Sequence, residues 1–161
     1  MDPRDALAIF LKKFVRDENI ATVLELGTGI GSGSFGGFNS AKAMIAGGVK
    51  VVVTIDKGTS TEAHSEKIIF YNSDITLIDD VIHKEYPERF DMIFMDADHD
   101  YSSVKLYWKL YSDLAKRYIV FHDRAEPGTA QILRELESEY KVTHVHQPPN
   151  GDPRIGIVDV S

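Results

Sequence analysis

The sequence predicts an α/β fold in which helices cover both faces of an open, mostly parallel sheet. Two observations support this prediction. Short apolar runs rich in β-branched residues alternate along the 161 residues with longer segments whose apolar residues recur at helical spacing. The first such run, 22–26, leads into a turn at 27–33 with glycine at every second position, which lets the backbone turn sharply. Because strands joined through helices lie parallel in one sheet, we expect an open three-layer sandwich.

Seven strands are expected. In chain order they lie at residues 22–26, 50–55, 68–71, 90–95, 118–121, 142–145 and 154–160. The second and the fourth are almost wholly apolar, as is typical of central parallel strands that are buried on both faces. The last two flank a loop rich in proline, glycine and asparagine at 147–153. They are therefore expected to close the sheet as an antiparallel pair.

Five helices are expected, at residues 4–17, 39–46, 76–85, 101–116 and 127–140. Each carries apolar residues on one face, which would pack on the sheet. Asn39 or Ser40 can cap the second helix, and the glycine pair 47–48 stops it. Pro87 ends the third helix, and Pro127 suits the first turn of the last one.

Composition limits the class of protein. The formal net charge is −7 and the longest basic run is Lys12-Lys13, which disfavours a non-specific nucleic-acid binder because such a protein needs a basic face. No apolar run approaches the length of about 20 residues that spans a membrane, and the N-terminus lacks the pattern of a secretory signal. The absence of cysteine excludes disulfides and thiolate sites and fits a reducing compartment. We expect a single cytoplasmic domain over residues 1–161, with no membrane or nucleic-acid partner; the oligomeric state stays open, with a dimer as one option.

Acidic residues lie at the ends of the central strands. Asp56, Asp74, Asp96 and Asp123 follow the second to fifth strands, and Glu25 lies inside the first. In open α/β sheets, ligands bind outside the carboxyl ends of the strands. These carboxylates are therefore expected to converge on one rim of the sheet, where they would face a ligand.

The ligand expected at this rim contains adenosine and lacks phosphate. A dinucleotide would bring its pyrophosphate to the glycine turn, where the carboxylate of Glu25 is poorly placed beside it. The spacing Gly-x-Gly-x-x-Gly, typical of dinucleotide sites, occurs only at 31–36, well past the strand. S-adenosylmethionine, with its amino group and sulfonium, suits an acidic rim better. Asp56 would then bind the ribose hydroxyls, Asp74 the adenine edge and Glu25 the methionyl end, directly or through water.

Glu25-Leu-Gly-Thr-Gly-Ile-Gly31 resembles motif I of the class I S-adenosylmethionine-dependent methyltransferases. The order of elements from residue 22 to the end is similar to the seven-stranded core of that family. The resemblance implies a Rossmann-like methyltransferase fold and one methyltransferase-like domain. Together with the reasoning above, it implies these cofactor-binding residues: Glu25, Gly27, Thr28, Gly29, Gly31, Asp56 and Asp74.

A second resemblance concerns the ends of the fourth and fifth strands. Phe94-Met-Asp-Ala-Asp-His-Asp-Tyr101 resembles the metal-dependent O-methyltransferases of the caffeoyl-CoA type and of the macrocin and cephalosporin-biosynthesis group, and Val120-Phe-His-Asp123 is similar to the latter group. The metal ligands that this implies are Asp96, His122 and Asp123. Oxygen ligands suit Mg²⁺, and a histidine in the set would tolerate Mn²⁺ or a later metal. Asp96 and His99 are the expected catalytic residues, with His99 as a general base.

Several of these residues also have a simpler structural interpretation. Asp74 lies in a segment that suits a helix cap, and His99 could instead orient a carboxylate. His144 and His146 alternate on a strand, which indicates a solvated edge rather than a metal pair. Arg154, at the start of the last predicted strand, is a candidate for substrate contact. Three aromatic residues of the fourth helix are expected in the core: Tyr107, Trp108 and Tyr111.

The sequence leaves more than one function open. The first is methyl transfer from S-adenosylmethionine to a hydroxyl of a small molecule, assisted by Mg²⁺ if a metal binds. The second is a methyltransferase-fold binding or partner subunit without catalysis, which the small size and the lack of a lid would suit. A nicotinamide-dependent oxidoreductase is disfavoured by the displaced third glycine.

Overall fold

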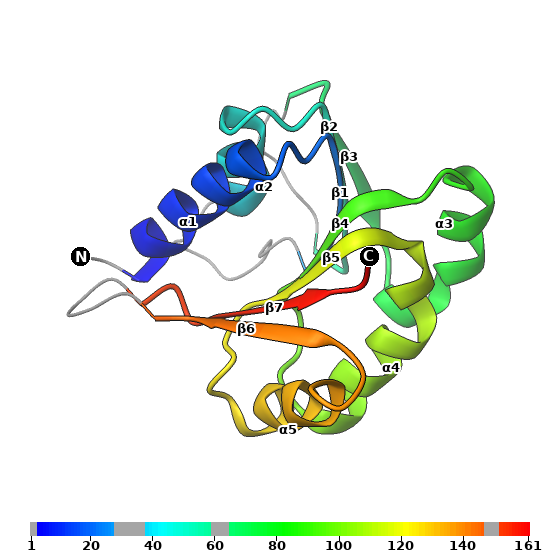
Figure 1. Cartoon of the computed structure of the whole chain (residues 1–161). Helices are drawn as coiled ribbons and strands as arrows, with labels where there is room; N and C mark the ends of the chain where they lie inside the picture. The colour runs from blue at the N-terminus through cyan, green and yellow to red at the C-terminus, as the bar shows by residue number, and fades with distance from the viewer. Residues whose placement is uncertain (1–2, 28–37, 59–64, 147–151) are drawn as a thin grey trace.

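The computed structural model describes residues 3–27, 38–58, 65–146 and 152–161 (Figure 1). In chain order the elements are α1 (Pro3–Asp17), β1 (Thr22–Leu26), α2 (Asn39–Ala46), β2 (Val51–Asp56), β3 (Ile68–Asn72), η1 (Ile75–Leu77), α3 (Asp79–Glu85), β4 (Phe90–Met95), α4 (Tyr101–Tyr111), η2 (Ser112–Leu114), β5 (Ala115–Phe121), α5 (Pro127–Leu136), β6 (Lys141–Val145) and β7 (Ile155–Asp159). The strands form one sheet in the order β3-β2-β1-β4-β5-β7-β6. Strands β1 to β5 pair in parallel, and β7 runs antiparallel to both β5 and β6. The predicted α/β fold with a mostly parallel seven-stranded sheet and an antiparallel last strand is confirmed.

The register of the strands brings their carboxyl ends level with one another. Leu26 of β1 pairs with Ile55 of β2 on one side and with Met95 of β4 on the other. β3 continues the edge, because Asp56 at the end of β2 pairs with Asn72. The strand order reverses between β1 and β4, and a doubly wound sheet forms its ligand crevice at this point.

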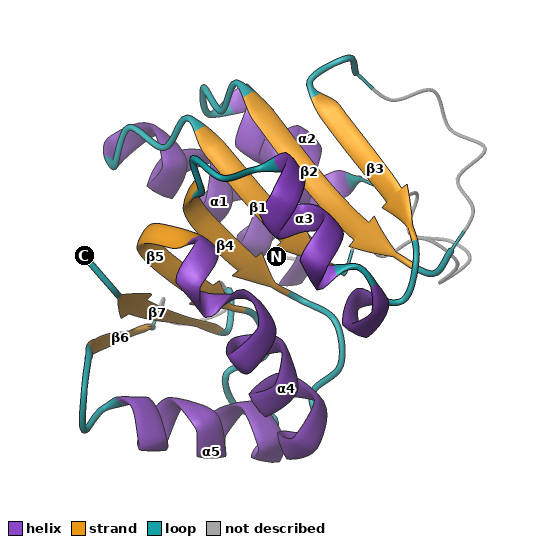
Figure 2. Ribbon diagram, turned by 90° about the vertical axis from the view of Figure 1, so that its right-hand side faces the viewer, coloured by secondary structure: helices purple, strands orange, loops and turns teal. Residues whose placement is uncertain are grey.

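Helices cover both faces of the sheet and make three layers (Figure 2). α1 and α2 lie on one face, and α3, α4 and α5 lie on the other. Successive residues of β1 point to opposite faces, so Val23 packs in the core under α1 and α2 while Leu24 packs under α4 and α5. Both side chains are fully buried. Among the described helices, none combines the length and the apolar character needed to cross a membrane.

Three predicted helices are shorter or more divided than expected. The helix predicted over 101–116 ends with α4, and after the single turn η2 the chain joins the sheet at Ala115. The helix predicted over 76–85 is divided between η1 and α3, because Asp74 caps a separate first turn. The helix predicted over 127–140 ends with α5. The first of these helices ends before the chain pairs with β4, the second is divided by the cap of Asp74, and α5 ends in the turn 137–139 that precedes β6.

Candidate functional site

Gly27 joins the end of β1 to the end of β4. Its φ is +92°, and a Cβ at this position would lie 2.3 Å from the backbone carbonyl oxygen of Asp96. Its N–H donates to the carbonyl of Ile55 at 2.9 Å. Only glycine allows this close approach, because the obstructing atoms belong to the backbone and cannot rotate away. The other turn residues predicted to bind the cofactor, Thr28, Gly29 and Gly31, lie outside the described residues.

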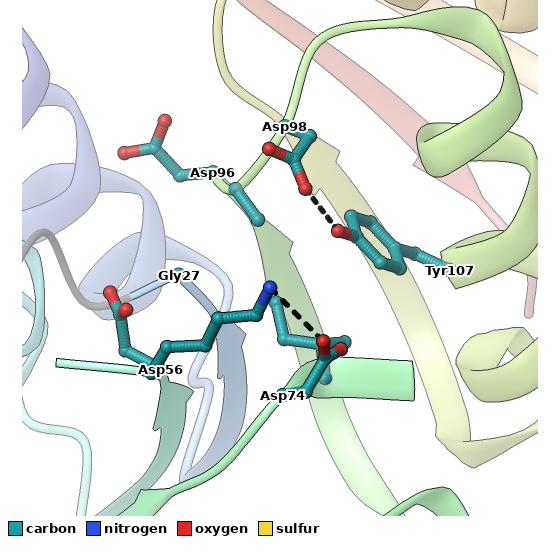
Figure 3. Close-up of a pocket in the computed structure, with 9 residues that line it drawn as sticks. Gly27, Asp56, Asp74, Asp96, Asp98 and Tyr107 are labelled. Carbon is teal, nitrogen blue, oxygen red and sulfur yellow. Dashed lines mark hydrogen bonds and ion pairs between the residues drawn. The ribbon is translucent and has the colours of Figure 1, made fainter. Parts of the chain in front are cut away.

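A hollow of about 290 Å³ opens beside Gly27 at the carboxyl edge of the sheet. Its polar lining consists of Asp56, Lys57, Asp74, Asp96, Asp98 and Tyr107. Figure 3 shows Asp56 and Asp74 at the ends of neighbouring strands, and Asp96 and Asp98 in the segment after β4. The structure therefore brings together three of the predicted acids, Asp56, Asp74 and Asp96, on one rim.

Asp74 serves as a helix cap and also faces the hollow. Its Oδ1 accepts hydrogen bonds from the N–H of Thr76 at 2.9 Å and from the hydroxyl of Thr76 at 2.8 Å. Its Oδ2 lies 3.0 Å from Nζ of Lys57. These hydrogen bonds, together with the ammonium, lower the pKa of Asp74 to about 2. The cap interpretation therefore holds, and it leaves one carboxylate oxygen directed toward the hollow.

Glu25 is completely buried in the middle of the sheet. Its Oε1 accepts a hydrogen bond from the hydroxyl of Ser40, in the first turn of α2, and Thr54 of β2 also hydrogen-bonds to the carboxylate. Its Oε2 has no hydrogen-bond partner within the described part of the chain. Burial, with the negative charges of Asp96 and Asp56 as smaller causes, raises the pKa of Glu25 to about 7. Glu25 is not among the described residues that line the hollow, so its predicted contact with the methionyl end stays a prediction.

A second polar cluster adjoins the hollow at the ends of β4 and β5. His122 Nδ1 lies 2.9 Å from Oδ1 of Asp96 and 3.3 Å from Oδ2 of Asp123. His99 Nε2 lies 3.1 Å from the same oxygen of Asp123. The hydrogen bond from His122 lowers the pKa of Asp123, and the nearby charges of His99 and Arg154 add to the effect. All four predicted catalytic and metal-binding residues are thus in contact through Asp123 and Asp96.

The donor set of this cluster fits a divalent cation. Asp96, His99 and Asp123 each offer one ligand atom, and these three atoms lie within 4.8 Å of one another. Two carboxylates with an imidazole suit Mg²⁺, Mn²⁺ or a later metal. His122 was predicted as the third ligand, but its Nδ1 is hydrogen-bonded between the two carboxylates. Burial opposes the charge on this ring, yet the hydrogen bonds to Asp123 and Asp96 outweigh it and raise the pKa of His122 to about 9. A proton on Nδ1 prevents that nitrogen from binding a metal, so ligation by His122 stays a prediction that requires a different hydrogen-bonding state.

Several residues that support the site were missed by sequence reasoning. Tyr107 is buried in the core as predicted, but its hydroxyl also donates to Asp98 in the lining of the hollow. A Cβ on Gly128, in the first turn of α5, would lie 2.2 Å from the carbonyl oxygen of His99. Gly128 therefore allows α5 to pack directly against the loop that carries His99. The Asp-Ala-Asp of 96–98 could have indicated that Asp98 also faces the ligand site. Nothing in the sequence indicates that Gly128 contacts the backbone of His99.

The remaining sequence predictions concern the far end of the rim. Arg154 Nη1 lies 3.2 Å from Oδ1 of Asp123, so this arginine contacts the cluster itself. His144 pairs with Glu137 at 3.0 Å, and His146 lies 3.1 Å from Nη2 of Arg124. Both histidines are exposed, which agrees with the solvated-edge interpretation.

The fold is that of the Rossmann-like class I methyltransferases, and the chain resembles their O-methyltransferases in its architecture. No protein-family model and no curated protein matches the sequence. Among solved structures, the O-methyltransferase from Bacillus cereus in complex with SAH has a TM-score of 0.68 at 18% identity, over 99% of this chain and 82% of that one. TomG from Streptomyces achromogenes, an O-methyltransferase involved in tomaymycin synthesis and solved with SAM, has a TM-score of 0.68 at 16% identity, over 96% of this chain and 79% of that one.

The methyltransferase MycE of the mycinamycin biosynthetic pathway, solved with Mg and SAH, has a TM-score of 0.65 at 14% identity. The match covers 92% of this chain and 47% of MycE. The present chain therefore spans about half the length of MycE. At these identities the likeness shows a shared fold.

Proposed function

We propose that this protein is an S-adenosylmethionine-dependent methyltransferase that transfers the methyl group to a hydroxyl of a small molecule in the cytoplasm. The observation that supports this function best is the double position of Asp96. Asp96 lines the hollow beside Gly27, and its carboxylate belongs to the cluster with His122 and Asp123. A cofactor in the hollow and an acceptor at the cluster would therefore meet at one residue.

The hollow suits the adenosyl cofactor in three respects. Gly27 leaves space for a ligand to approach the backbone at the end of β1. Asp56, at the end of β2, is in the position to bind the ribose hydroxyls, and Oδ2 of Asp74 can accept from an amino group on the base. Four carboxylates and one ammonium line the hollow among the described residues, and this excess of negative charge favours a ligand with an ammonium and a sulfonium over one with phosphates. The related folds solved with SAH or SAM support the same assignment.

His99 would accept the proton of the acceptor hydroxyl. Its Nε2 lies 3.1 Å from Asp123, so a proton shared there leaves Nδ1 free to act as the base, and the carboxylate stabilises the resulting imidazolium. Gly128 allows α5 to hold the backbone of His99 in place. The chain would then contribute mainly by orienting the hydroxyl oxygen in line with the methyl group.

Asp96 and Asp123, with His99 as the third donor, would hold a divalent cation such as Mg²⁺. Such an ion lowers the pKa of a bound hydroxyl and fixes its orientation. If His99 ligates the ion through Nε2, its own proton lies on Nδ1 and neither nitrogen can accept another, so a different group must take the proton of the acceptor. Removal of the metal with a chelator distinguishes these arrangements: activity that survives chelation shows that no metal is required and leaves His99 available as the base.

Calorimetry with SAM and with SAH, its demethylated product, tests the proposal. We expect affinities in the micromolar range, with no displacement by NAD⁺. Absence of binding at millimolar ligand would contradict the function. Transfer of a labelled methyl group to phenolic, catecholic or sugar hydroxyls, with and without MgCl₂, then identifies the acceptor class. Binding of SAM without transfer to any acceptor would instead indicate a non-catalytic subunit.

A further inference from the structure

A lysine ammonium lies in the hollow itself. Lys57 follows the last residue of β2 and reaches across to the segment after β3, where its Nζ lies 3.0 Å from Oδ2 of Asp74. The dashed line to Asp74 in Figure 3 is this ion pair. The hydrogen bond to Asp74 raises the pKa of Lys57, with the charges of Asp98 and Asp56 as smaller causes. The acidic hollow is thus neutralised in part by a cation that belongs to the chain.

The two oxygens of Asp74 differ in their freedom to change partners. Oδ1 accepts from both the N–H and the hydroxyl of Thr76, and losing these bonds would uncap η1. Oδ2 is engaged by Lys57, whose side chain is 74% exposed and can move into solvent without disturbing the core. Oδ2 is therefore the oxygen that a ligand in the hollow can use, and Lys57 already occupies it.

We propose that Lys57 sets the affinity and the base specificity of the hollow, because a nucleoside base must present an N–H donor to Oδ2 of Asp74 in order to replace the ammonium. This inference rests on the proposed function and adds the selecting residue to it. An aminopurine such as adenine offers an N–H donor at its edge. A base with a carbonyl oxygen at the same position would face the carboxylate with a second acceptor, and the ammonium would remain paired.

The effect of Lys57 on ligand affinity depends on how exposed its ion pair with Asp74 is. An ion pair between solvent-exposed side chains is weak, so its loss should change ligand affinity by only about two- to fivefold. The sign of the change is the informative quantity. Removing a competitor strengthens binding, whereas removing a ligand contact or a merely structural residue weakens it or leaves it unchanged.

The test is a titration of SAH, which carries no net charge, into the wild-type protein, Lys57→Met and Lys50→Met. Lys50 is an exposed lysine just before β2, at the opposite end of that strand from the hollow, and serves as the matched control. At low salt, about 20 mM NaCl, Lys57→Met should bind SAH about two- to fivefold more tightly than the other two proteins. At about 500 mM NaCl the wild-type protein should approach the affinity of Lys57→Met, because salt screens the ion pair. Lys57→Gln should repeat the result.

Equal or weaker binding by Lys57→Met would overturn the inference while leaving the proposed function intact. Failure of all three proteins to bind SAH would overturn the proposed function, and the inference with it. The base is tested with the deaminated form of SAH, in which a carbonyl replaces the amino group. We expect at least about tenfold weaker binding of this analogue to the wild-type protein, and equal binding of the two ligands would overturn the assigned base specificity.

Discussion

The two halves of the rim are built differently. On the β2–β3 half, each acid accepts a hydrogen bond from a residue close by in the chain: Asp56 from the N–H of Gly58 at 3.3 Å, and Asp74 from Thr76, by which it caps η1. The contact of Asp74 with a separate segment is its ion pair with the exposed Lys57. On the β4–β5 half, the side chains join different strands and loops. His122 of the segment after β5 lies 2.9 Å from Asp96 after β4.

This difference indicates which half tolerates change. A locally held acid can be replaced with little effect on its neighbours, so the β2–β3 half should respond to substitutions one residue at a time. In the cross-strand cluster, Asp123 contacts His99, His122 and Arg154 together. Removing one member leaves charges uncompensated on several others, and the effects should not be additive.

The largest effect is expected at the cluster. Asp96→Asn should lower kcat at least about 100-fold, because it removes a carboxylate that orients His122 and the proposed metal or acceptor, while SAH affinity should change by less than about threefold. Asp100→Asn is the matched control in the same loop: Asp100 caps α4 by accepting from Ser103 at 3.0 Å, and asparagine caps equally well. If the control loses as much activity, the loop is sensitive as a whole and the contrast between the halves fails.

Gly27 lies at the boundary between the two halves. Its substitution should destabilise the protein more than substitution of Gly48, the other described glycine with a positive φ. Gly27→Ala adds backbone overlap with Asp96 to the strain of a φ of +92°, for a cost of about 3 kcal/mol in the free energy of unfolding. Gly48→Ala is the control, because its φ is +112° but no atom lies within 4 Å of the added Cβ. It should cost about 1 kcal/mol. Equal costs in urea unfolding would show that the end of β1 can move away from β4.

Glu25, buried behind both halves, should make stability depend on pH. The pKa of Glu25 is 4.5 in the unfolded chain and about 7 in the folded protein, because burial favours the protonated carboxyl. Its contribution to the free energy of unfolding is therefore fully present below pH 4.5 and is lost as the pH rises through about 7. Glu25→Gln removes this titration. The variant should match the wild-type protein near about pH 5 and exceed its free energy of unfolding by about 2 kcal/mol near about pH 9. Parallel pH profiles of the two proteins would contradict the burial of a titrating carboxylate.

The smallest effect is expected on the locally held half. Asp56→Ala should weaken SAH binding about tenfold by removing hydrogen bonds to the ribose, with kcat at saturating SAM nearly unchanged. Asp56→Asn should recover part of the affinity, since an amide oxygen still accepts. A collapse of kcat in Asp56→Ala would show that the two halves are coupled and would remove the distinction between them.

Local patterns were enough to locate most of the sheet. The strands predicted at 22–26 and 90–95 agree with β1 and β4 residue for residue, because an apolar run bounded by polar or glycine residues has few other stable conformations in a buried position. The convergence of Asp56, Asp74 and Asp96 was predictable for a related reason. In a parallel sheet, residues that follow strands necessarily share an edge.

Pairings between distant residues could not be predicted in the same way. The sequence predicts His122 as a metal ligand and His99 as a general base. In the structure, His122 is hydrogen-bonded between the two carboxylates, while His99 offers a nitrogen to the metal-binding group. The approach of Gly128 to His99 depends on the angle at which α5 packs, which no local pattern encodes.

Residue types and their periodicity decide which elements form and which side chains reach the rim, because burial of apolar faces is a property of each segment and its spacing. Folding decides which of those side chains meet. The ammonium of Lys57 on Asp74, the hydrogen bonds of His122 to two carboxylates and the raised pKa of the buried Glu25 all arise from distances between separate segments. Coulombic and hydrogen-bond energies fall steeply with such distances, so the chemistry of this site is determined only when the strands and loops are packed together.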